Sequence, residues 1–466
     1  MFSRREVLRA LGAVPACLAR RGLGATDLPY RRLGKTERWV VPYGLGGQAS
    51  LELSGGAMDR PDIIVRAVEL GINYLDTANA YGPSQSYYGQ AFSRLHLKPD
   101  DPNYNGALRE RLYIASKTGQ RYALNRAQPN AATALSDLRN TLTQIFGDGK
   151  GYIPEGAYLN AFQIHNLGNL QQVDQIWENF SNRGDRSLQR LGALAGLLDY
   201  RDGTNVTGLN PEHRRWVRHL GITGHNSSVL IPCLQRDTEN ILDTLLTVVN
   251  ANDRQYVPNQ NNVIPVAVAR DMGVIAMKVF AQGGIYTQPR QTYIYTVGVA
   301  GGIPCTDLVR YPVSIPGVTV AIVGICQIDR SNLANDQLVS NLAAGVQDPA
   351  SLAELRRIEA DLAALHGINT NYYQERGRGL VQPTQVSLER DGDRVIVKWN
   401  AAVAGPEPIR SYQIWDGDRL VAVLPFRAQT TLEPLSATVP GSSLATGTVR
   451  VLASEASALP PRRRAG

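Results

Sequence analysis

The stretch GINYLDTANAYGPSQSYYG, residues 71–89, decides the fold because it places a charge where an apolar strand ends. The segment INYLDT has the composition of a buried strand, yet it carries the carboxylate of Asp76 near its end. A tyrosine, Tyr81, follows five residues later, in a turn that Gly82 and Pro83 close. A buried strand gains no stability from a terminal charge. We therefore expect Asp76 and Tyr81 to serve a chemical purpose at the end of this strand.

Short apolar runs of this kind recur along the chain, and most are separated by segments with helical periodicity. Eight of them occupy residues 40–47, 73–78, 112–117, 161–166, 219–224, 245–250, 273–278 and 319–324. Apolar strands that alternate with helices indicate a parallel sheet buried on both faces. Eight units favour an α/β fold of the (β/α)8 TIM barrel type, with an open doubly wound sheet as the alternative. Residues 28–40 predict a short hairpin before the first barrel strand.

Composition excludes several classes of function. The chain has 466 residues with 43% hydrophobic and 19% charged residues, which fits a soluble globular protein. Its net charge of +7 is scattered, so we expect no nucleic-acid partner. No apolar run approaches the roughly 18 residues that a membrane span needs. The four cysteines lie far apart without a CxxC pair, so we expect no metal site.

The two ends of the chain differ from the barrel segment of residues 28–370. Residues 1–25 combine Ser3-Arg4-Arg5 with a modest apolar segment, which resembles a twin-arginine signal peptide and predicts a periplasmic or secreted protein. A basic first helix is the alternative. Residues 456–466, which end in PPRRRAG, predict a disordered tail.

Residues 380–455 alternate between apolar and polar side chains with a period of two and are divided by DGD turns. This pattern predicts a small all-β sandwich, with Trp399 and Tyr412 in its core. The segment resembles a fibronectin type III domain. Such a domain offers a surface for contact with carbohydrate or protein.

Polar residues end three consecutive barrel strands: Asp76, Lys117 and His165. The carboxyl ends of barrel strands share one face, so these side chains should lie near one another and near Tyr81. A phenol has a reference pKa near 10, which a neighbouring ammonium lowers. A carboxylate holds that ammonium, and a neutral imidazole orients a carbonyl oxygen against the phenol. The set suits protonation of a carbonyl oxygen while hydride arrives at its carbon.

The motifs DTANAYG, ASKTG, QIHN, HLGITGHN, GVIAMKVFAQGG and AIVG together resemble the aldo-keto reductase family over residues 28–345. The resemblance places the family's catalytic tetrad on Asp76, Tyr81, Lys117 and His165. It implies a nicotinamide nucleotide bound without a Rossmann fingerprint, NADP with NAD as the alternative. The residues that it places along the nucleotide are Gly46, Gly47, Thr223, Gly224, Asn250, Lys278, Phe280, Ala281, Gly283, Arg330 and Asn335.

The resemblance implies an exported NAD(P)-dependent oxidoreductase that acts on a small carbonyl or polyol substrate. Two alternatives stay open: a lyase or epimerase that uses the nucleotide transiently, and a nucleotide-occupied binding protein without turnover. Three long segments rich in tyrosine and asparagine, residues 93–111, 146–158 and 285–304, are expected to lie above the barrel mouth. Because tyrosine offers both a stacking face and a hydroxyl, these loops indicate a sugar-like substrate.

Overall fold

The structure is a computed structural model, and it describes residues 28–55, 58–119, 129–281, 285, 303–366, 374–377 and 379–455. The predicted barrel is confirmed: eight parallel strands close in the order β10-β3-β4-β5-β6-β7-β8-β9. They are β3 (Tyr43–Gly46), β4 (Tyr74–Asp76), β5 (Tyr113–Lys117), β6 (Leu159–Leu167), β7 (Val217–Gly224), β8 (Leu242–Val248), β9 (Gly273–Met277) and β10 (Val320–Gly324). Each of the eight apolar runs contributes one strand. The predicted signal peptide, the tail and Gly283 lie outside the described residues.

The barrel strands are buried on both faces, which explains why their sequences are apolar runs rather than alternating patterns. The sheet closes where β10 pairs with β3, in a register that sets Gly324 beside Gly46. One apolar layer lies between the strands and the surrounding helices, and a second fills the barrel interior. Because all eight strands run in parallel, their carboxyl ends meet at one mouth.

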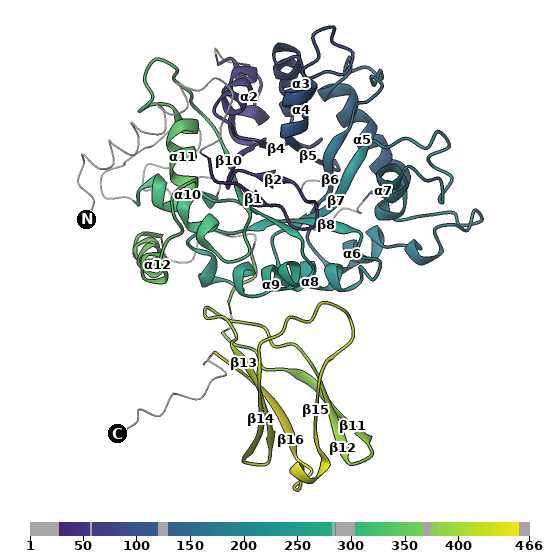
Figure 1. Cartoon of the computed structure of the whole chain (residues 1–466), viewed down its shortest axis with the longest axis vertical. Coiled ribbons are helices and arrows are strands. Elements are labelled where there is room, and N and C mark those ends of the chain that lie inside the picture. The colour runs from purple at the N-terminus through teal and green to yellow at the C-terminus, as the bar shows by residue number, and fades with distance from the viewer. Residues whose placement is uncertain are drawn as a thin grey trace.

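The helices form the outer ring of the barrel (Figure 1). They are α2 (Arg60–Glu69), α3 (Ser84–Arg94), α4 (Gly106–Arg111), α5 (Ala131–Ile145), α6 (Leu170–Ile176), α7 (Ala193–Asp202), α8 (Ser227–Gln235), α9 (Val263–Ala269), α10 (Cys305–Ser314), α11 (Gln337–Gly345) and α12 (Leu352–His366). Polar caps start several of them. The Asn130 side chain accepts from the Thr133 amide at 2.9 Å, and Asp336 accepts from the Leu338 amide at 3.1 Å. Among the described residues, no helix combines the length and apolar character of a membrane span.

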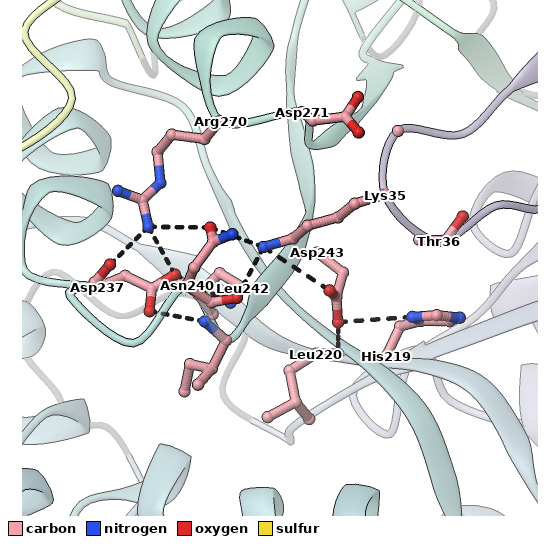
Figure 2. Close-up of polar contacts among 12 residues, drawn as sticks. Lys35, Thr36, His219, Leu220, Asp237, Asn240, Leu242, Asp243, Arg270 and Asp271 are labelled. Atoms are coloured by element: carbon pink, nitrogen blue, oxygen red, sulfur yellow. Dashed lines mark hydrogen bonds and ion pairs between the residues drawn. The ribbon is translucent and has the colours of Figure 1, made fainter.

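A hairpin of β1 (Arg31–Arg32) and β2 (Trp39–Val40) lies across the amino ends of the strands (Figure 1). Gly34 makes this contact possible: its φ is +52°, and a Cβ there would lie 2.3 Å from the Gly273 nitrogen. Figure 2 shows the polar residues around this end. Lys35 donates to the backbone and side-chain oxygens of Asn240, both at 2.8 Å, and lies 3.9 Å from Asp243. The hairpin is thereby fixed to the barrel, and the opposite mouth is left for chemistry.

The C-terminal domain consists of two three-stranded antiparallel sheets, β11-β12-β15 and β14-β13-β16. Their strands are β11 (Thr384–Asp391), β12 (Arg394–Asn400), β13 (Ser411–Asp416), β14 (Arg419–Pro425), β15 (Leu435–Pro440) and β16 (Val449–Ser454). Trp399 and Tyr412 are each 1% exposed in a core that is separate from that of the barrel. The domain lies beside α8 and α9 (Figure 1).

The expected position of two substrate loops is wrong. Residues 93–111 and 146–158 connect helices to the beginnings of β5 and β6, so they lie at the hairpin end of the barrel. An ion pair of 2.6 Å between Arg38, next to β2, and Glu110 confirms this placement. The composition of a loop does not say which end of a barrel it occupies, because that depends on whether it follows a strand or a helix. Of the third loop, residues 285–304, the structure describes only Ile285, Ile303 and Pro304.

Candidate active site

Three of the four predicted tetrad residues come from adjacent strands at the barrel mouth, and the fourth comes from the turn that follows the first of these strands. Asp76 is the last residue of β4, Lys117 is the last residue of β5, and His165 lies near the end of β6. Tyr81 belongs to the turn between β4 and α3, where its amide donates to the Ala78 oxygen at 3.1 Å. The parallel order β4-β5-β6 therefore brings together residues that are 89 positions apart in sequence at most (165 − 76).

Asp76 and Lys117 form a buried ion pair. The Lys117 Nζ lies 2.7 and 2.6 Å from the two carboxylate oxygens and donates to the Thr77 oxygen at 2.9 Å. The residues are 1% and 0% exposed. Burial raises the pKa of Asp76 and lowers the pKa of Lys117, while their mutual attraction opposes both shifts. Lys117 is thus fixed in position with all three of its protons engaged.

Tyr81 and His165 are the tetrad members closest to the surface, with exposures of 5% and 6%. The Tyr81 hydroxyl lies 3.4 Å from His165 Nε2, and the rings meet edge to face with centroids 5.4 Å apart. Lys117 Nζ lies 4.9 Å from the centroid of the Tyr81 ring. A carbonyl group arriving at the mouth meets Tyr81 and His165 first, with the ion pair behind them.

A chain of hydrogen bonds links the ends of β5, β6 and β7. The His165 amide donates to Thr118 Oγ1 at 3.0 Å, and the Asn166 amide donates to Thr223 Oγ1 at 2.6 Å. His225 Nδ1 pairs with Asn166 Oδ1 at 2.8 Å. Thr223 thus supports the strand end that carries His165.

Sequence reasoning assigned no role to Asn166 or His225, although both belong to quoted motifs. The sequence does contain a signal for them. A His-Asn pair occurs twice at the end of a predicted barrel strand, at residues 165–166 and 225–226, and His165 belongs to the first of these pairs. Burial and the charge of Lys278 lower the pKa of His225 to about 3, so its imidazole stays neutral in the physiological range. Asn166 has a φ of +54°, a left-handed conformation that occurs at functional sites more often than elsewhere.

Lys278 and Asn250 lie together at the ends of β9 and β8. The Asn250 side chain donates to the Lys278 oxygen at 3.0 Å, and Lys278 Nζ donates to Gln48 Oε1 at 3.0 Å. Lys278 and Ala281 have φ values of +57° and +45° and close a turn with a 2.7 Å bond. Each such conformation costs about 1–3 kcal/mol in a residue other than glycine. The turn directs a cation to the mouth, which fits the diphosphate of a nucleotide; Phe280 lies within it, 9% exposed.

The predicted glycines are required by packing around the site. A Cβ on Gly47 would lie 2.3 Å from the Asp76 oxygen and 2.7 Å from Thr77 Cα. A Cβ on Gly46 would lie 3.0 Å from the Val323 carbonyl carbon, and one on Gly224 would lie 2.9 Å from Leu230 Cδ2. At these three positions a side chain would collide with neighbouring segments of the barrel, so glycine is required by packing alone.

We expect Gly47→Ala to lower the free energy of unfolding by about 1–3 kcal/mol, because the added methyl group overlaps the backbone at Asp76. Urea unfolding measures the change. Gly184→Ala is the matched control, since its nearest neighbour would be Val206 Cγ1 at an ordinary 3.6 Å. Equal stabilities of the two variants would contradict the close approach at Gly47.

Arg330 and Asn335, expected near the adenosine end, lie in the loop between β10 and α11. Arg330 donates to Asp62 at 2.7 and 3.2 Å and to Glu69 at 2.5 Å, and these bonds raise the pKa of its guanidinium. Asn335 donates to Asp329 at 3.4 Å. Two carboxylates of α2 thus already balance the arginine, so a 2′-phosphate would have to compete with them. The contact of Arg330 with the nucleotide stays a prediction.

No curated protein matches the chain. Among solved structures, an aldo-keto reductase from Bacillus halodurans in its holo form shares 18% identity over 72% of this chain and 96% of its own, with a TM-score of 0.48. An aldo/keto reductase from Klebsiella pneumoniae in complex with NADP and acetate shares 18% identity over 73% and 96%, with a TM-score of 0.47. A Pseudomonas aeruginosa protein assigned as an aldo-keto reductase shares 22% identity over 69% and 96%, with a TM-score of 0.42.

The chemistry of the site rests on its own side chains. A family model covers part of the same barrel, including β4, β5 and β6. Residues 47–193 match the model of the aldo/keto reductase family, and this stretch contains Asp76, Tyr81, Lys117 and His165.

Proposed function

We propose that this chain is an exported NAD(P)-dependent oxidoreductase of the aldo-keto reductase type, which transfers hydride to or from a sugar-like carbonyl or alcohol. The observation that carries the proposal is the tetrad geometry. The Tyr81 hydroxyl lies 3.4 Å from His165 Nε2, and Lys117 Nζ, paired with Asp76, lies 4.9 Å from the Tyr81 ring. This is the arrangement that proton donation to a carbonyl oxygen requires.

In reduction, the Tyr81 hydroxyl donates its proton to the carbonyl oxygen, and the product is an alcohol. The buried ammonium of Lys117 stabilises the phenolate that remains on Tyr81. His165 Nε2 orients the carbonyl oxygen beside the hydroxyl. A bound nicotinamide nucleotide supplies or accepts the hydride. In oxidation, the phenolate of Tyr81 takes the proton from the alcohol instead.

The described residues fit the nucleotide at its nicotinamide and diphosphate end. Lys278 supplies the cation, and Asn250 fixes the turn that presents it. The buried glycines Gly46 and Gly47 keep β3 close to its neighbours. At the adenosine end, the carboxylates around Arg330 oppose a 2′-phosphate, so discrimination between NADP and NAD depends on whether Arg330 leaves Asp62 and Glu69. We propose NADP, with NAD as the alternative.

The sugar-like substrate is proposed from the polarity of the mouth. His165 contacts Tyr81, and the neighbouring strand ends carry Asn166 and His225; all three side chains have hydrogen-bonding groups. Such groups suit a polyhydroxylated carbonyl better than an apolar one. Steady-state assays with matched aldoses, polyols and apolar aldehydes test this point. Higher kcat/KM for the apolar aldehydes would exclude the sugar-like substrate and leave the reaction class intact.

Export predicts that the nucleotide is retained through many turnovers. The Ser3-Arg4-Arg5 segment implies transport after folding, and the cell envelope has no known pool of free nucleotide to replace a lost one. We expect the purified protein to carry about one nucleotide per chain. The Kd should be nanomolar, which corresponds to a binding free energy on the order of −12 kcal/mol. Denaturation followed by chromatography counts the nucleotide and distinguishes NADP from NAD. Protein that is free of nucleotide, with a micromolar Kd, would indicate an ordinary exchanging reductase.

A further inference from the structure

The loop that follows β8, residues 249–262, is bonded to the segment that leads into the C-terminal domain. Val257 N donates to the Glu375 oxygen at 2.9 Å, and Tyr256 forms an isolated antiparallel bridge with Arg376. Glu375 N donates to the side chain of Asn226, next to the end of β7, at 3.1 Å. Residues 374–377, called the strap below, thus join two loops at the catalytic mouth.

The same loop carries Asn250 near its start and is held together by backbone and amide side-chain hydrogen bonds. Asp253 N donates to the Asn250 oxygen at 2.9 Å, and Asn252 N donates to Asn250 Oδ1 at 2.9 Å. At its far end, Asn259 donates to the oxygens of His225 and Val248, both at 3.1 Å. The loop is therefore one bonded unit, and a displacement of its middle part moves Asn250.

The C-terminal domain docks on this unit. Asn262 donates to the Ala404 oxygen at 3.1 Å and accepts from the Ala404 amide at 2.9 Å. Arg254 reaches the carboxylate of Glu407 and donates to the Pro406 oxygen at 2.8 Å. The loop is thus bonded both to the strap and to the C-terminal domain that follows the strap in sequence.

At the centre of these contacts, Asp253 and Gln374 form a hydrogen-bonded pair. With Asp253 ionised, this pair has only one of the two hydrogen bonds that an acid and an amide can share. They are 0% and 7% exposed, and Gln374 Nε2 donates to Asp253 Oδ1. Asp253 Oδ2 and Gln374 Oε1 are both buried acceptors that have no hydrogen-bond donor among the described residues. A proton on Oδ2 would complete a cyclic acid–amide pair and satisfy both atoms at once. A buried acceptor left unmade costs about 1–3 kcal/mol, which favours the protonated form.

We propose that Asp253 is held as a neutral carboxylic acid whose pair with Gln374 fastens the strap, and that both are positioning residues for the Asn250 loop. The proposal deepens the proposed function, on which the role of Asn250 rests. On this proposal the strap, which leads into the C-terminal domain, helps to hold the Asn250 loop in position at the barrel mouth.

The charge environment of Asp253 agrees with a neutral acid. Burial and, to a smaller extent, the charge of Glu359 on α12 raise its pKa to about 7, against the lowering effect of Gln374 and of the backbone amides of Gln260 and Asn259. Glu359 is itself engaged: Tyr311 donates to it at 2.6 Å, and Arg254 and Arg356 pair with it. Because the pKa in the closed state lies above the ordinary value of 3.8, the acid stabilises closure fully below pH 3.8. This stabilisation is lost as the pH rises from 3.8 to about 7, and it changes no further above that pH.

Amide hydrogen exchange of residues 250–262 and 374–377 tests the pair without reference to nucleotide. Asp253→Asn keeps two hydrogen bonds with Gln374 at every pH, so comparing it with the native protein removes the intrinsic pH dependence of exchange. We expect the two to exchange alike below the ordinary pKa of 3.8. Between that pH and about pH 7 the native protein should exchange about tenfold faster per pH unit relative to the variant, and above pH 7 the ratio of the two rates should stay constant. A ratio of native to Asp253→Asn exchange rates that does not change with pH would overturn the proposal.

Two further variants separate the pair from its surroundings. Gln374→Leu removes both bonds and should exchange fast at every pH, whereas Glu375→Gln, whose backbone makes the bonds to Asn226 and Val257, should titrate like the native protein. The dissociation rate of NADP, measured over the same pH range, should rise for the native protein and stay constant for Asp253→Asn. Constant rates in both proteins would overturn the link to Asn250. Protein that binds no nucleotide would refute the proposed function, while the exchange data would still decide the pair.

Discussion

Tyr81→Phe is expected to lower kcat by about 10²–10⁴-fold while the affinity for nucleotide stays unchanged. The substitution removes one hydroxyl, the group that lies 3.4 Å from His165 Nε2, and keeps the ring that packs against His165 and Lys117. A carbonyl oxygen would then develop negative charge without the hydroxyl that supplies its proton. Steady-state turnover and nucleotide titration on the same preparation measure the two quantities.

Tyr87→Phe is the matched control for this loss. Tyr87 lies on α3, the helix that follows Tyr81, and its hydroxyl donates to the Leu53 oxygen at 3.1 Å. It loses a hydrogen bond of similar kind outside the tetrad, so its turnover should stay near that of the native protein. If Tyr81→Phe also turned over at that rate, Tyr81 would not be the acid, and another group, such as His165, would have to donate the proton.

Lys117→Met is expected to lower the free energy of unfolding by about 3–5 kcal/mol and to abolish turnover. The substitution leaves the Asp76 carboxylate, 1% exposed, without the ammonium that contacts both its oxygens. Burial already raises the pKa of Asp76, and losing Lys117 raises it further, since the lysine is the largest opposing cause. The raised pKa means that the cost is largest above that pKa and disappears as the pH falls below the unfolded value. Urea unfolding at several pH values measures this slope.

The double variant Asp76→Leu/Lys117→Met distinguishes a buried pair from a hydrated one. Replacing both charges by apolar groups of similar size removes the unpaired carboxylate, so most of the lost stability should return while turnover stays absent. A loss of only about 1 kcal/mol in Lys117→Met, typical of exposed ion pairs, would show that water reaches Asp76. Recovery of stability without recovery of turnover would show that the ion pair is kept for chemistry.

The sequence alone predicts the barrel and the tetrad for the same reason. Apolar runs such as residues 112–117 can only be strands buried on both faces, and their spacing leaves room for one helix between most of them. Since parallel strands end at one face, polar residues at three strand ends must meet there, and Asp76, Lys117 and His165 do. These conclusions depend on local composition and on one general property of barrels, so no knowledge of particular contacts is needed.

Other features depend on which distant segments lie together, which only the tertiary structure decides. Residues 93–111 are at the hairpin end because they follow a helix, and Arg330 is balanced by carboxylates on α2, 268 and 261 positions away. Asp253 meets Gln374 across 121 positions, inside a contact between the barrel and the strap. Sequence composition shows which side chains are polar. Burial sets their pKa values and partners, and burial is known only once the segments that cover a side chain are in place.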